Sequence, residues 1–439
     1  MLKVDNFSQR LVGKRVFYGW AIVAIALVTG MVSAGISAYG LAFFVVPMSM
    51  SLGVSRAVFS SITLFRLAAV PVAPIVGVLL DKKHGSRLLL TFGSIAAGIM
   101  LLLTARVQSI WEFYLIFGVG FGLAITIMGG NLIAPAVIPK WFVRKRGRAI
   151  AVGTMGISMG GLVVAPLVGW LIAAFDWRTS WAILGAVVIV AISPLSAVFM
   201  RRSPEDIGLL PDGDVTHKES AAQNERYRET SGDSEYPWTV WEALRTRTCW
   251  VILGVQLLGF TALSPVIIHQ VAYIRDKGFS PQTATLVATS LAFFAMVAKL
   301  TWGYLAERVH VQRLFPFCLL PAGLSLLLLI WARSTPMLYA YALLHGLTMG
   351  GFPPLVNLAW STYFGRRHMG AIQGVVAPIS NLISALSPVL AGWLWDLRGS
   401  YALPFVAFAV MWLFAGLLMM LARTPKRPDT LGTQLRNST

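Results

Sequence analysis

Twelve long apolar stretches constrain this chain more than any other feature of its sequence. Each has roughly 20 residues or more, the length a helix needs to cross a bilayer core of about 30 Å. Unpaired backbone groups are costly in hydrocarbon, so we expect every stretch to be helical. With 56% hydrophobic and only 12% charged residues, the chain has too little polar surface for a soluble domain. The predicted fold class is an all-α polytopic membrane protein with twelve transmembrane helices. The stretches are 18–47, 55–80, 87–105, 111–138, 149–173, 180–200, 248–274, 281–306, 311–332, 336–362, 370–395 and 402–422.

The net charge of +18 is unevenly distributed along the chain. Basic residues gather before the first stretch and in the 2–3 and 4–5 loops, whereas the loops on the other side hold few. This asymmetry is typical of the positive-inside rule, by which lysine and arginine stay in the cytoplasm. The charge therefore sets the membrane topology, with both termini cytoplasmic, and does not indicate binding of nucleic acid.

The two halves of the chain echo each other. "GVLLDK" (77–82) answers "GYLAER" (303–308), and "WFVRKRGRAI" (141–150) answers "YFGRRHMGAI" (363–372). "MGG" recurs at 128–130 and 349–351, and "GWL" at 169–171 and 392–394, so the four offsets run from 221 to 226 residues. Parallel six-helix repeats imply two bundles related by an axis along the membrane normal, with a substrate site near the midplane between them.

The expected organisation has five segments. A polar, acid-rich cytoplasmic linker separates the two bundles, and "WTVWEALRTRTCW" (238–250) at its end predicts a short interfacial helix with Trp anchors. The segments are a cytoplasmic N-terminal segment 1–17, the N-terminal bundle 18–200, the linker 201–247, the C-terminal bundle 248–422 and a cytoplasmic tail 423–439.

The repeated Gly-x-Leu-x-Asp/Glu-Lys/Arg loops resemble the signature of the major facilitator superfamily over nearly the whole chain. Several stretches also resemble the bacterial monocarboxylate and oxalate–formate transporter group, which implies a multi-pass protein of the inner cell membrane. Two departures concern the loops: the first has an extra residue between Asp81 and Gly85, and the second has Glu307 for Asp without the following glycine. The resembling stretches are "FYGW" (17–20), "FFVVPMSMSLGVSRAVFS" (43–60), "KWFVRKRGRAIAVGTMGISMGGLVVAPLVGWL" (140–171), "RRSPEDIGLLPDGD" (201–214) and "HQVAYIRDKGFSP" (269–281).

These two loops are interpreted as a gate. A carboxylate at a cytoplasmic helix end can face the positive N-terminus of a neighbouring helix and pair with loop arginines. Such contacts form when the cytoplasmic side is shut and break when it opens. The alternative is positive-inside charge with a turn at Gly85. The gating residues are Gly77, Asp81, Lys82, Gly85, Arg87, Gly303, Glu307 and Arg308.

Two basic residues lie inside apolar stretches. Lys299 is about seven residues, or ~11 Å, from the cytoplasmic end of its span. Arg66 lies near the middle of the second span. An ionisable residue in a span is a functional candidate by default, and the position four before Gly303 matches a substrate-binding cation of the resembled family. The alternatives are snorkelling for Lys299 and a structural link between helices for Arg66.

No Asp or Glu lies well inside any of the twelve spans. Two intramembrane cations without a buried counter-ion predict an electropositive cavity, and a substrate with its own carboxylate would supply the missing charge. We therefore expect the cargo to be the partner of Lys299.

Four further residues are candidates for the substrate site. His269 matches a family histidine and could donate to a carboxylate or carry a proton, although a histidine near an interface often only anchors. Asn131 and His345 could orient substrate, or hold helices together. Tyr39 could be a cavity donor or a packed aromatic.

The sequence lacks a phosphate-binding loop, a metal cluster and a Ser/His/Asp arrangement, so neither an enzyme nor a cofactor is predicted. The predicted function is a secondary transporter for a small, monocarboxylate-like organic anion in a lipid bilayer. Transport would use proton symport, with His269 or His345 as carrier, or exchange for a second anion. The alternatives are a carrier for a neutral or aromatic solute such as a vitamin or xenobiotic, in uptake or efflux, and a non-transporting receptor. The oligomeric state is left open.

Overall fold

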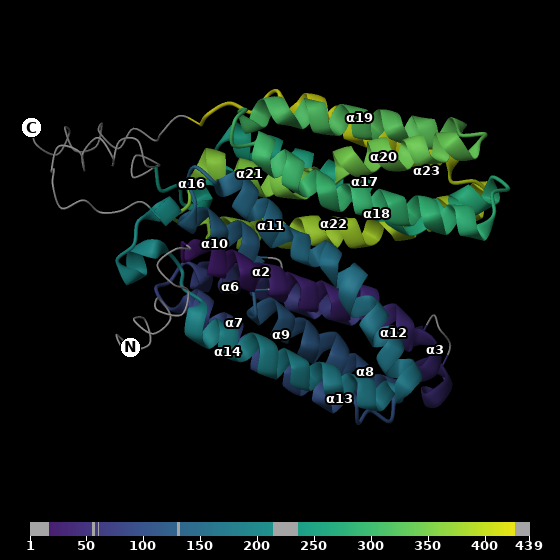
Figure 1. Ribbon diagram of the computed structural model, residues 1–439, viewed down its shortest axis with the longest axis horizontal. Coiled ribbons are helices and arrows are strands. Elements are labelled where there is room, and N and C mark those ends of the chain that lie inside the picture. The colour runs from purple at the N-terminus through teal and green to yellow at the C-terminus, as the bar shows by residue number, and fades with distance from the viewer. Residues whose placement is uncertain (1–16, 55–57, 60, 130–131, 214–235, 426–439) are drawn as a thin grey trace, which may run out of the picture.

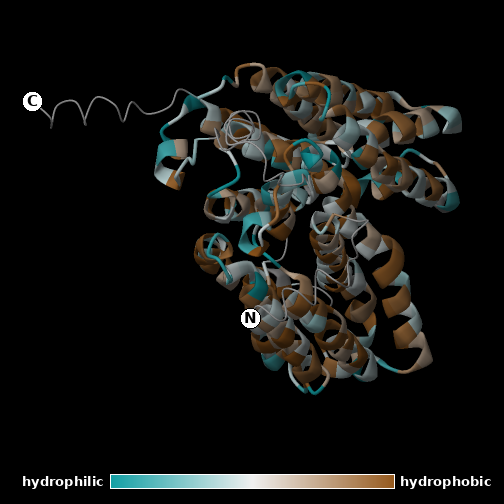
Figure 2. Ribbon diagram, turned by 60° about the vertical axis from the view of Figure 1, so that its left-hand side comes forward, coloured by the Kyte–Doolittle hydropathy of each residue, from teal (hydrophilic) through white to brown (hydrophobic). Residues whose placement is uncertain are grey.

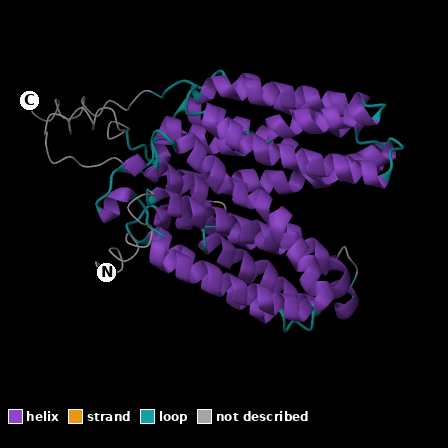
Figure 3. Cartoon of the chain, in the orientation of Figure 1, coloured by secondary structure: helices purple, strands orange, loops and turns teal. Residues whose placement is uncertain are grey.

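The computed structural model describes residues 17–54, 58–59, 61–129, 132–213 and 236–425. Within these ranges every regular element is helical (Figure 3).

The N-terminal bundle contains six spans, several of which include a π or 3-10 segment. They are α2 (Gly19–Ala34) with η1 (Gly35–Gly40) and α3 (Leu41–Leu52); α5 (Ile62–Phe65) with η2 (Arg66–Val72) and α6 (Ala73–Leu80); α7 (Gly85–Thr104); α8 (Ile110–Phe113) with η3 (Tyr114–Phe121), α9 (Gly122–Ile127) and α10 (Ile133–Trp141); α11 (Arg146–Met159) with η5 (Gly160–Val164) and α12 (Ala165–Ala174); and α13 (Trp177–Val187) with η6 (Val188–Ile192) and α14 (Ser193–Phe199).

The C-terminal bundle repeats this arrangement with straighter helices. Between the bundles lie two 3-10 turns, η7 (Pro204–Ile207) and η8 (Pro211–Gly213), and the short helix α16 (Val240–Leu244). The bundle itself consists of α17 (Arg247–Asp276), α18 (Pro281–Leu305), α19 (Val311–Trp331), α20 (Thr335–Met349) with α21 (Phe352–Phe364), α22 (Met369–Arg398) and α23 (Ala402–Met419).

In the described part of the chain, ten helices are long and apolar enough to cross a membrane. The other two predicted spans are interrupted. The 55–80 stretch is divided into α5, η2 and α6, and the 336–362 stretch into α20 and α21. The protein thus has the predicted fold class, twelve spans in two six-helix bundles.

The recurring MGG sequences coincide with breaks in equivalent helices. α9 and α10 are separated at the first, and α20 and α21 at the second. Gly129 has a φ of +83°, which residues with a side chain rarely adopt. At Gly350, an added Cβ would lie 2.3 Å from the carbonyl oxygen of Ala295 on α18. The glycines therefore permit both the break and the close approach of neighbouring helices.

The bundles lie against each other on one side and diverge towards the other (Figures 1 and 2). We call the converging side, which carries residues 201–213 and 236–247, the linker side, and the opposite side the far end. Contacts between the bundles pair α6 with α22 and α11 with α18, and also join α10 to α22 and α11 to α21. The two bundles are thus closed against each other near the linker side.

The outer faces of the helices are apolar. Figure 2 shows hydrophobic residues along the helices and hydrophilic ones mainly at their ends. Large side chains such as Val190 and Phe317, each 72% exposed, project from the spans. A surface of this kind is suited to lipid rather than water.

The described parts of the linker pack against the linker side. The Asp212 carboxylate accepts hydrogen bonds from three successive backbone N–H groups, those of residues 143–145, at 2.8 to 3.2 Å. This places a negative charge at the start of α11, where the helix dipole favours it. The short helix predicted within 238–250 is present as α16, which begins with a capping box of Thr239 and Glu242.

Candidate functional site

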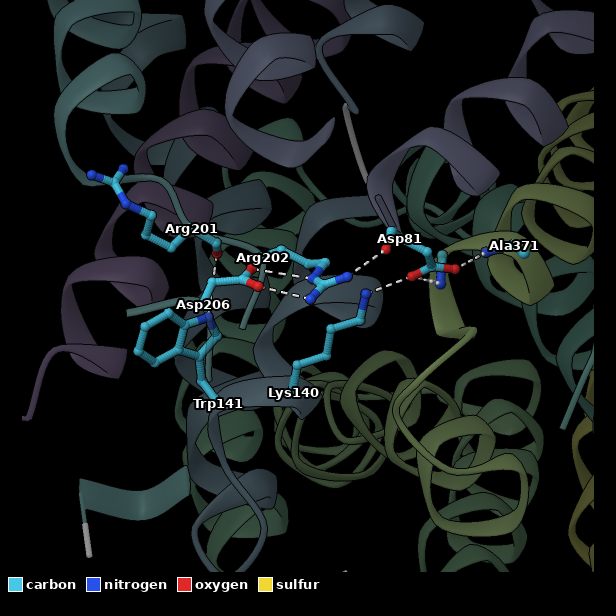
Figure 4. Close-up of polar contacts among 8 residues, drawn as sticks. Asp81, Lys140, Trp141, Arg201, Arg202, Asp206 and Ala371 are labelled. Carbon is cyan, nitrogen blue, oxygen red and sulfur yellow. Dashed lines mark hydrogen bonds and ion pairs between the residues drawn. The ribbon is translucent and has the colours of Figure 1, made fainter. Parts of the chain in front are cut away.

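Asp81 joins the two bundles at the linker side (Figure 4). Its carboxylate accepts hydrogen bonds from the Lys140 ammonium at 2.5 Å and from the backbone N–H groups of Gly370 (3.2 Å) and Ala371 (2.8 Å). Both N–H groups belong to the first turn of α22, so the carboxylate faces the positive end of a helix dipole. We call these four residues the first latch. The sequence predicts this placement, but the charged partner is a lysine rather than a loop arginine.

Glu307 makes the equivalent contact in the other half. Its carboxylate accepts from the backbone N–H of Arg148 at 3.0 Å and from the Nε of the same residue at 2.8 Å. Arg148 lies in the first turn of α11, and we call this pair the second latch. Its cation is 43% exposed, against 5% for the Lys140 side chain, so water screens the second latch more.

Beside each latch, two helices cross with their backbones in contact. A Cβ added at Gly77 of α6 would lie 2.3 Å from the carbonyl oxygen of Gly370 on α22. A Cβ added at Gly147 of α11 would lie 2.2 Å from the carbonyl oxygen of Gly303 on α18. Small residues at such positions let helices approach closely in a membrane. All four positions are glycine, which allows the helix backbones to meet at these crossings.

A cavity of about 580 Å³ opens next to the first latch. Asp81 and Lys140 line it from one bundle, and Arg366 and His368 from the other. Arg366 pairs with Glu205 at 3.1 Å, which ties the linker to this junction. Burial lowers the pKa of His368, so its imidazole is neutral at pH 7 and the positive charge here comes from lysine and arginine.

Lys299 lies on α18 where it faces α11 of the other bundle. The side chain is 6% exposed, and its ammonium donates to the Ser158 hydroxyl at 2.6 Å and, weakly, to the backbone carbonyl of Thr154 at 3.4 Å. Ser158 is 12 residues beyond Arg146 at the start of α11, about 18 Å along the helix. The ammonium therefore lies deep between the bundles and is held by neutral oxygen atoms.

Arg66 occupies the start of η2 in the second span. Its guanidinium donates to the backbone carbonyl of Ser37 at 2.8 Å and lies 5.4 Å from the centroid of the Phe117 ring. These partners are also neutral, and all belong to the N-terminal bundle. Among the described residues, Arg66 and Lys299 share no partner: Arg66 is bonded within the N-terminal bundle, whereas Lys299 is bonded across the interface to α11.

A sequence profile described as Major Facilitator Superfamily matches residues 25–273 and 249–437, which together cover nearly the whole chain. The chain belongs to the Major Facilitator Superfamily. It is therefore a membrane transporter rather than an enzyme.

Named relatives of this superfamily member include monocarboxylate transporters. Rat monocarboxylate transporter 12 is 26% identical over 435 residues, which cover 93% of this chain and 86% of the relative. Rat monocarboxylate transporter 2 is 24% identical over 355 residues, which cover 79% of this chain and 71% of the relative. The predicted resemblance to this group of transporters is confirmed.

Solved superfamily structures share the fold. The human organic anion transporter MFSD10 aligns with a TM-score of 0.63 at 15% identity, over 91% of this chain and 99% of its own. The E. coli fucose:proton symporter FucP aligns with a TM-score of 0.65 at 12% identity, over 92% of this chain and 99% of its own.

The two histidines lie inside the C-terminal bundle. The Nε2 of His269 is 3.0 Å from the Pro388 carbonyl oxygen of α22, and its ring stacks on Tyr401. His345 is fully buried, with its Nδ1 2.7 Å from the Ser325 hydroxyl of α19. Its Nε2 has no hydrogen-bond partner in the described part of the chain. The structure brings neither histidine into contact with Lys299.

The remaining substrate candidates lie in the N-terminal bundle or outside the described residues. Tyr39 is 40% exposed on η1, and its ring faces Gly161 of η5, where an added Cβ would lie 3.2 Å away. Asn131 is outside the described residues. Tyr39 thus contacts the fifth span of its own bundle.

The other gating residues have different surroundings. An added Cβ at Gly85 would lie 1.6 Å from the carbonyl oxygen of Leu79, so the turn after α6 requires glycine. Lys82 is exposed and Arg87 is half-buried. The Arg308 guanidinium, in the turn after α18, lies 4.4 Å from the ring of Tyr304 at the end of that helix.

Sequence reasoning did not single out two residues that the structure places at the interface. Lys140 was grouped with the basic charges that set topology, yet it is the cation of the first latch. Ser158 carries no charge signal, yet it is the nearest partner of Lys299. Its sequence signal is weak: it is one of two hydroxyl residues, with Thr154, in an apolar and glycine-rich span.

Proposed function

We propose that this superfamily member is a secondary transporter that moves a small organic anion of the monocarboxylate type by alternating access. The observation that supports the proposal most strongly is the Lys299 ammonium, buried between the bundles with neutral partners only. A buried charge without a counter-ion is costly, and a carboxylate at this position would supply the missing charge. The names of the relatives point to the same substrate class.

Rocking of the bundles would carry the anion across. The latches and glycine crossings close the linker side, while the bundles diverge towards the far end. In the opposite state both carboxylates would leave their helix N-termini, and the anion would face the linker side. The positive-inside rule makes that side cytoplasmic, in the cell's inner membrane.

The test is uptake by purified protein in proteoliposomes. Short monocarboxylates and dicarboxylates compete with each other, whereas amides of the same size do not, because only the acids carry charge. Lys299→Ala is expected to reduce carboxylate transport by about tenfold or more while the protein still inserts, since a buried charge partner is worth ~2–5 kcal/mol.

If Lys299→Ala transports carboxylate at the wild-type rate, Lys299 does not bind the substrate as proposed. Equal competition by the amides, or by neutral aromatic solutes, would favour the alternative of a carrier for uncharged cargo, in which both cations are structural.

A further inference from the structure

We propose that Lys299 is also the group that carries the coupled proton, so that the protein is a symporter whose substrate anchor and proton carrier are one side chain. This inference rests on the proposed function. It is carried by the position of the ammonium between the bundles, by its two neutral partners, and by the places of the histidines.

The histidines are poorly placed to couple protons to substrate. His269 is bonded to the backbone of α22 and stacked on Tyr401, and His345 is sealed between α19 and α20 beside Ser325. Both sets of contacts lie within one bundle. A proton on either imidazole would therefore not reach the cargo or the moving interface directly.

The helices packed against α18 present no acid to Lys299. These helices are α11, α17, α20 and α21. Apart from the two histidines, their charged residues lie at the helix ends, and Glu307, just beyond α18, pairs with Arg148. Among the described residues none of these groups forms a hydrogen bond or ion pair with Lys299. The end residues are Arg146 and Arg148 on α11, and Arg247, Arg275 and Asp276 on α17.

Ser158 is a suitable partner for both protonation states of the lysine. Its hydroxyl accepts a hydrogen bond from the ammonium, and it can donate one to the neutral amine, because a hydroxyl is both donor and acceptor. Ser158 is also half-buried rather than sealed. The amine can therefore lose its proton without leaving a buried polar atom unpaired.

The transport cycle then balances. The neutral amine takes one proton from the far-end solution, and the ammonium binds the carboxylate. The bundles rock, the carboxylate leaves on the linker side, and the ammonium releases its proton there. The neutral amine returns with the empty carrier. One proton and one carboxylate move together, and no bond other than N–H is formed or broken.

The proton on Lys299 and the charge of the carboxylate cancel, so the two moving states have equal charge. The Arg66 guanidinium stays protonated in proteins, so the empty carrier with a neutral lysine keeps one positive charge. The loaded carrier, with both cations and a monocarboxylate, also has one net positive charge. An empty carrier with both cations charged would instead move two uncompensated charges through the membrane, which is costly.

The test separates exchange from net uptake in proteoliposomes containing Lys299→Arg. Arginine still binds a carboxylate but cannot release its proton. We expect exchange of external for preloaded internal carboxylate to continue within a few-fold of wild type. Net uptake into empty vesicles, driven by an inward proton gradient, should fall by about tenfold or more, because the empty carrier must return charged. Lys277→Arg, at the far end of α17 and bonded to the Ile330 carbonyl, is the matched control and should leave both rates unchanged.

Gradient-driven net uptake by Lys299→Arg at the wild-type rate would overturn the inference. If Lys299→Arg is inactive in both assays, the same two assays on His269→Gln and His345→Gln distinguish a lysine from a histidine as the proton carrier. Proton-driven uptake by both histidine variants supports Lys299 as the proton carrier. If either variant still exchanges carboxylate but has lost proton-driven uptake, that assignment is overturned. Wild-type exchange without any net uptake would refute this inference and leave the proposed function intact, whereas absence of carboxylate transport in both assays would refute the proposed function itself.

Discussion

At the proposed substrate site, Lys299 and Ser158 form a contact that a carboxylate would replace or extend. The ammonium donates to the Ser158 hydroxyl at 2.6 Å, and this is the deepest polar contact between the bundles on α11. A neutral hydroxyl satisfies the ammonium only in part. A carboxylate forms a stronger, charge-assisted hydrogen bond, so binding has a net electrostatic gain.

Ser158→Ala should lower the KM for the carboxylate by about two- to tenfold, because a net hydrogen bond of ~0.5–1.5 kcal/mol no longer competes with the cargo. Initial rates of exchange over a range of substrate concentrations measure this. Ser196→Ala, at a buried serine of α14 that contacts Thr91 within the same bundle, is the control. A higher KM in Ser158→Ala would mean that the hydroxyl contacts the cargo itself.

The two latch carboxylates differ in their number of partners. Asp81 accepts from a buried ammonium and two backbone N–H groups, whereas both donors to Glu307 come from the half-exposed Arg148. A buried charged hydrogen bond contributes more than an exposed one. The first latch should therefore hold the linker side more strongly than the second.

Asp81→Asn should open the linker side more than Glu307→Gln does. Modification of a cysteine introduced at the linker side should become faster by about tenfold in the first variant and less in the second, since charged hydrogen bonds contribute ~1.5–3 kcal/mol. The two native cysteines are buried and do not interfere. Lys83→Gln, an exposed neighbour of the latch, should leave the rate unchanged. Equal rates in all variants would count against the latch.

Among the helices, close contact between the two bundles occurs at two glycine crossings. α6 meets α22 at Gly77, and α18 meets α11 at Gly303. No flexible side chain can move aside at these positions, because an added Cβ would face backbone atoms at Gly77, and the Ala151 Cβ and the Gly147 carbonyl oxygen at Gly303. The closed packing has no room for an added methyl group. Substitution by alanine should therefore push the two helices apart and open the linker side.

Gly77→Ala should shift the carrier towards the state open at the linker side. Overpacking of this kind costs ~1–3 kcal/mol, which corresponds to about a five- to 150-fold change in the population ratio. Gly392→Ala on α22 is the control, since an added Cβ there would only touch the His269 ring at 3.9 Å. Accessibility of an introduced cysteine at the linker side measures the shift, and identical values for both variants would contradict the role of the crossing.

The sequence alone predicts the helices well, but it predicts only some of the contacts between them. The bilayer forces apolar stretches into helices, so all twelve spans follow from hydropathy, and the internal repeat places Asp81 and Glu307 at equivalent positions. The partner of Lys299 could not be predicted, because a serine on span five has no charge signal and the pairing depends on how the bundles pack. The orientation of His345 towards α19 could not be predicted either, because hydropathy does not show which neighbouring helix an apolar face contacts.

For the molecule as a whole, the charge of the cargo is the proposed cause of bundle movement. Ligand binding shifts an equilibrium only by the difference in affinity between its two states. In the proposed mechanism, a carboxylate bound at Lys299 lies between the bundles and contacts both, and a neutral analogue would bind there less strongly. The acid should therefore change the balance between the states, and its amide should not.

The measurement that tests this claim most directly is the distance between spin labels on the two bundles, with and without a carboxylate. Label pairs at Lys83→Cys with Val309→Cys report on the linker side, and pairs at Arg106→Cys with Arg333→Cys on the far end, since all four positions are exposed. We predict that a monocarboxylate lengthens the linker-side distances and shortens the far-end ones, and that the amide, or the acid added to Lys299→Ala, changes neither. Equal shifts with acid and amide, or an acid-induced shift that persists in Lys299→Ala, would contradict the account.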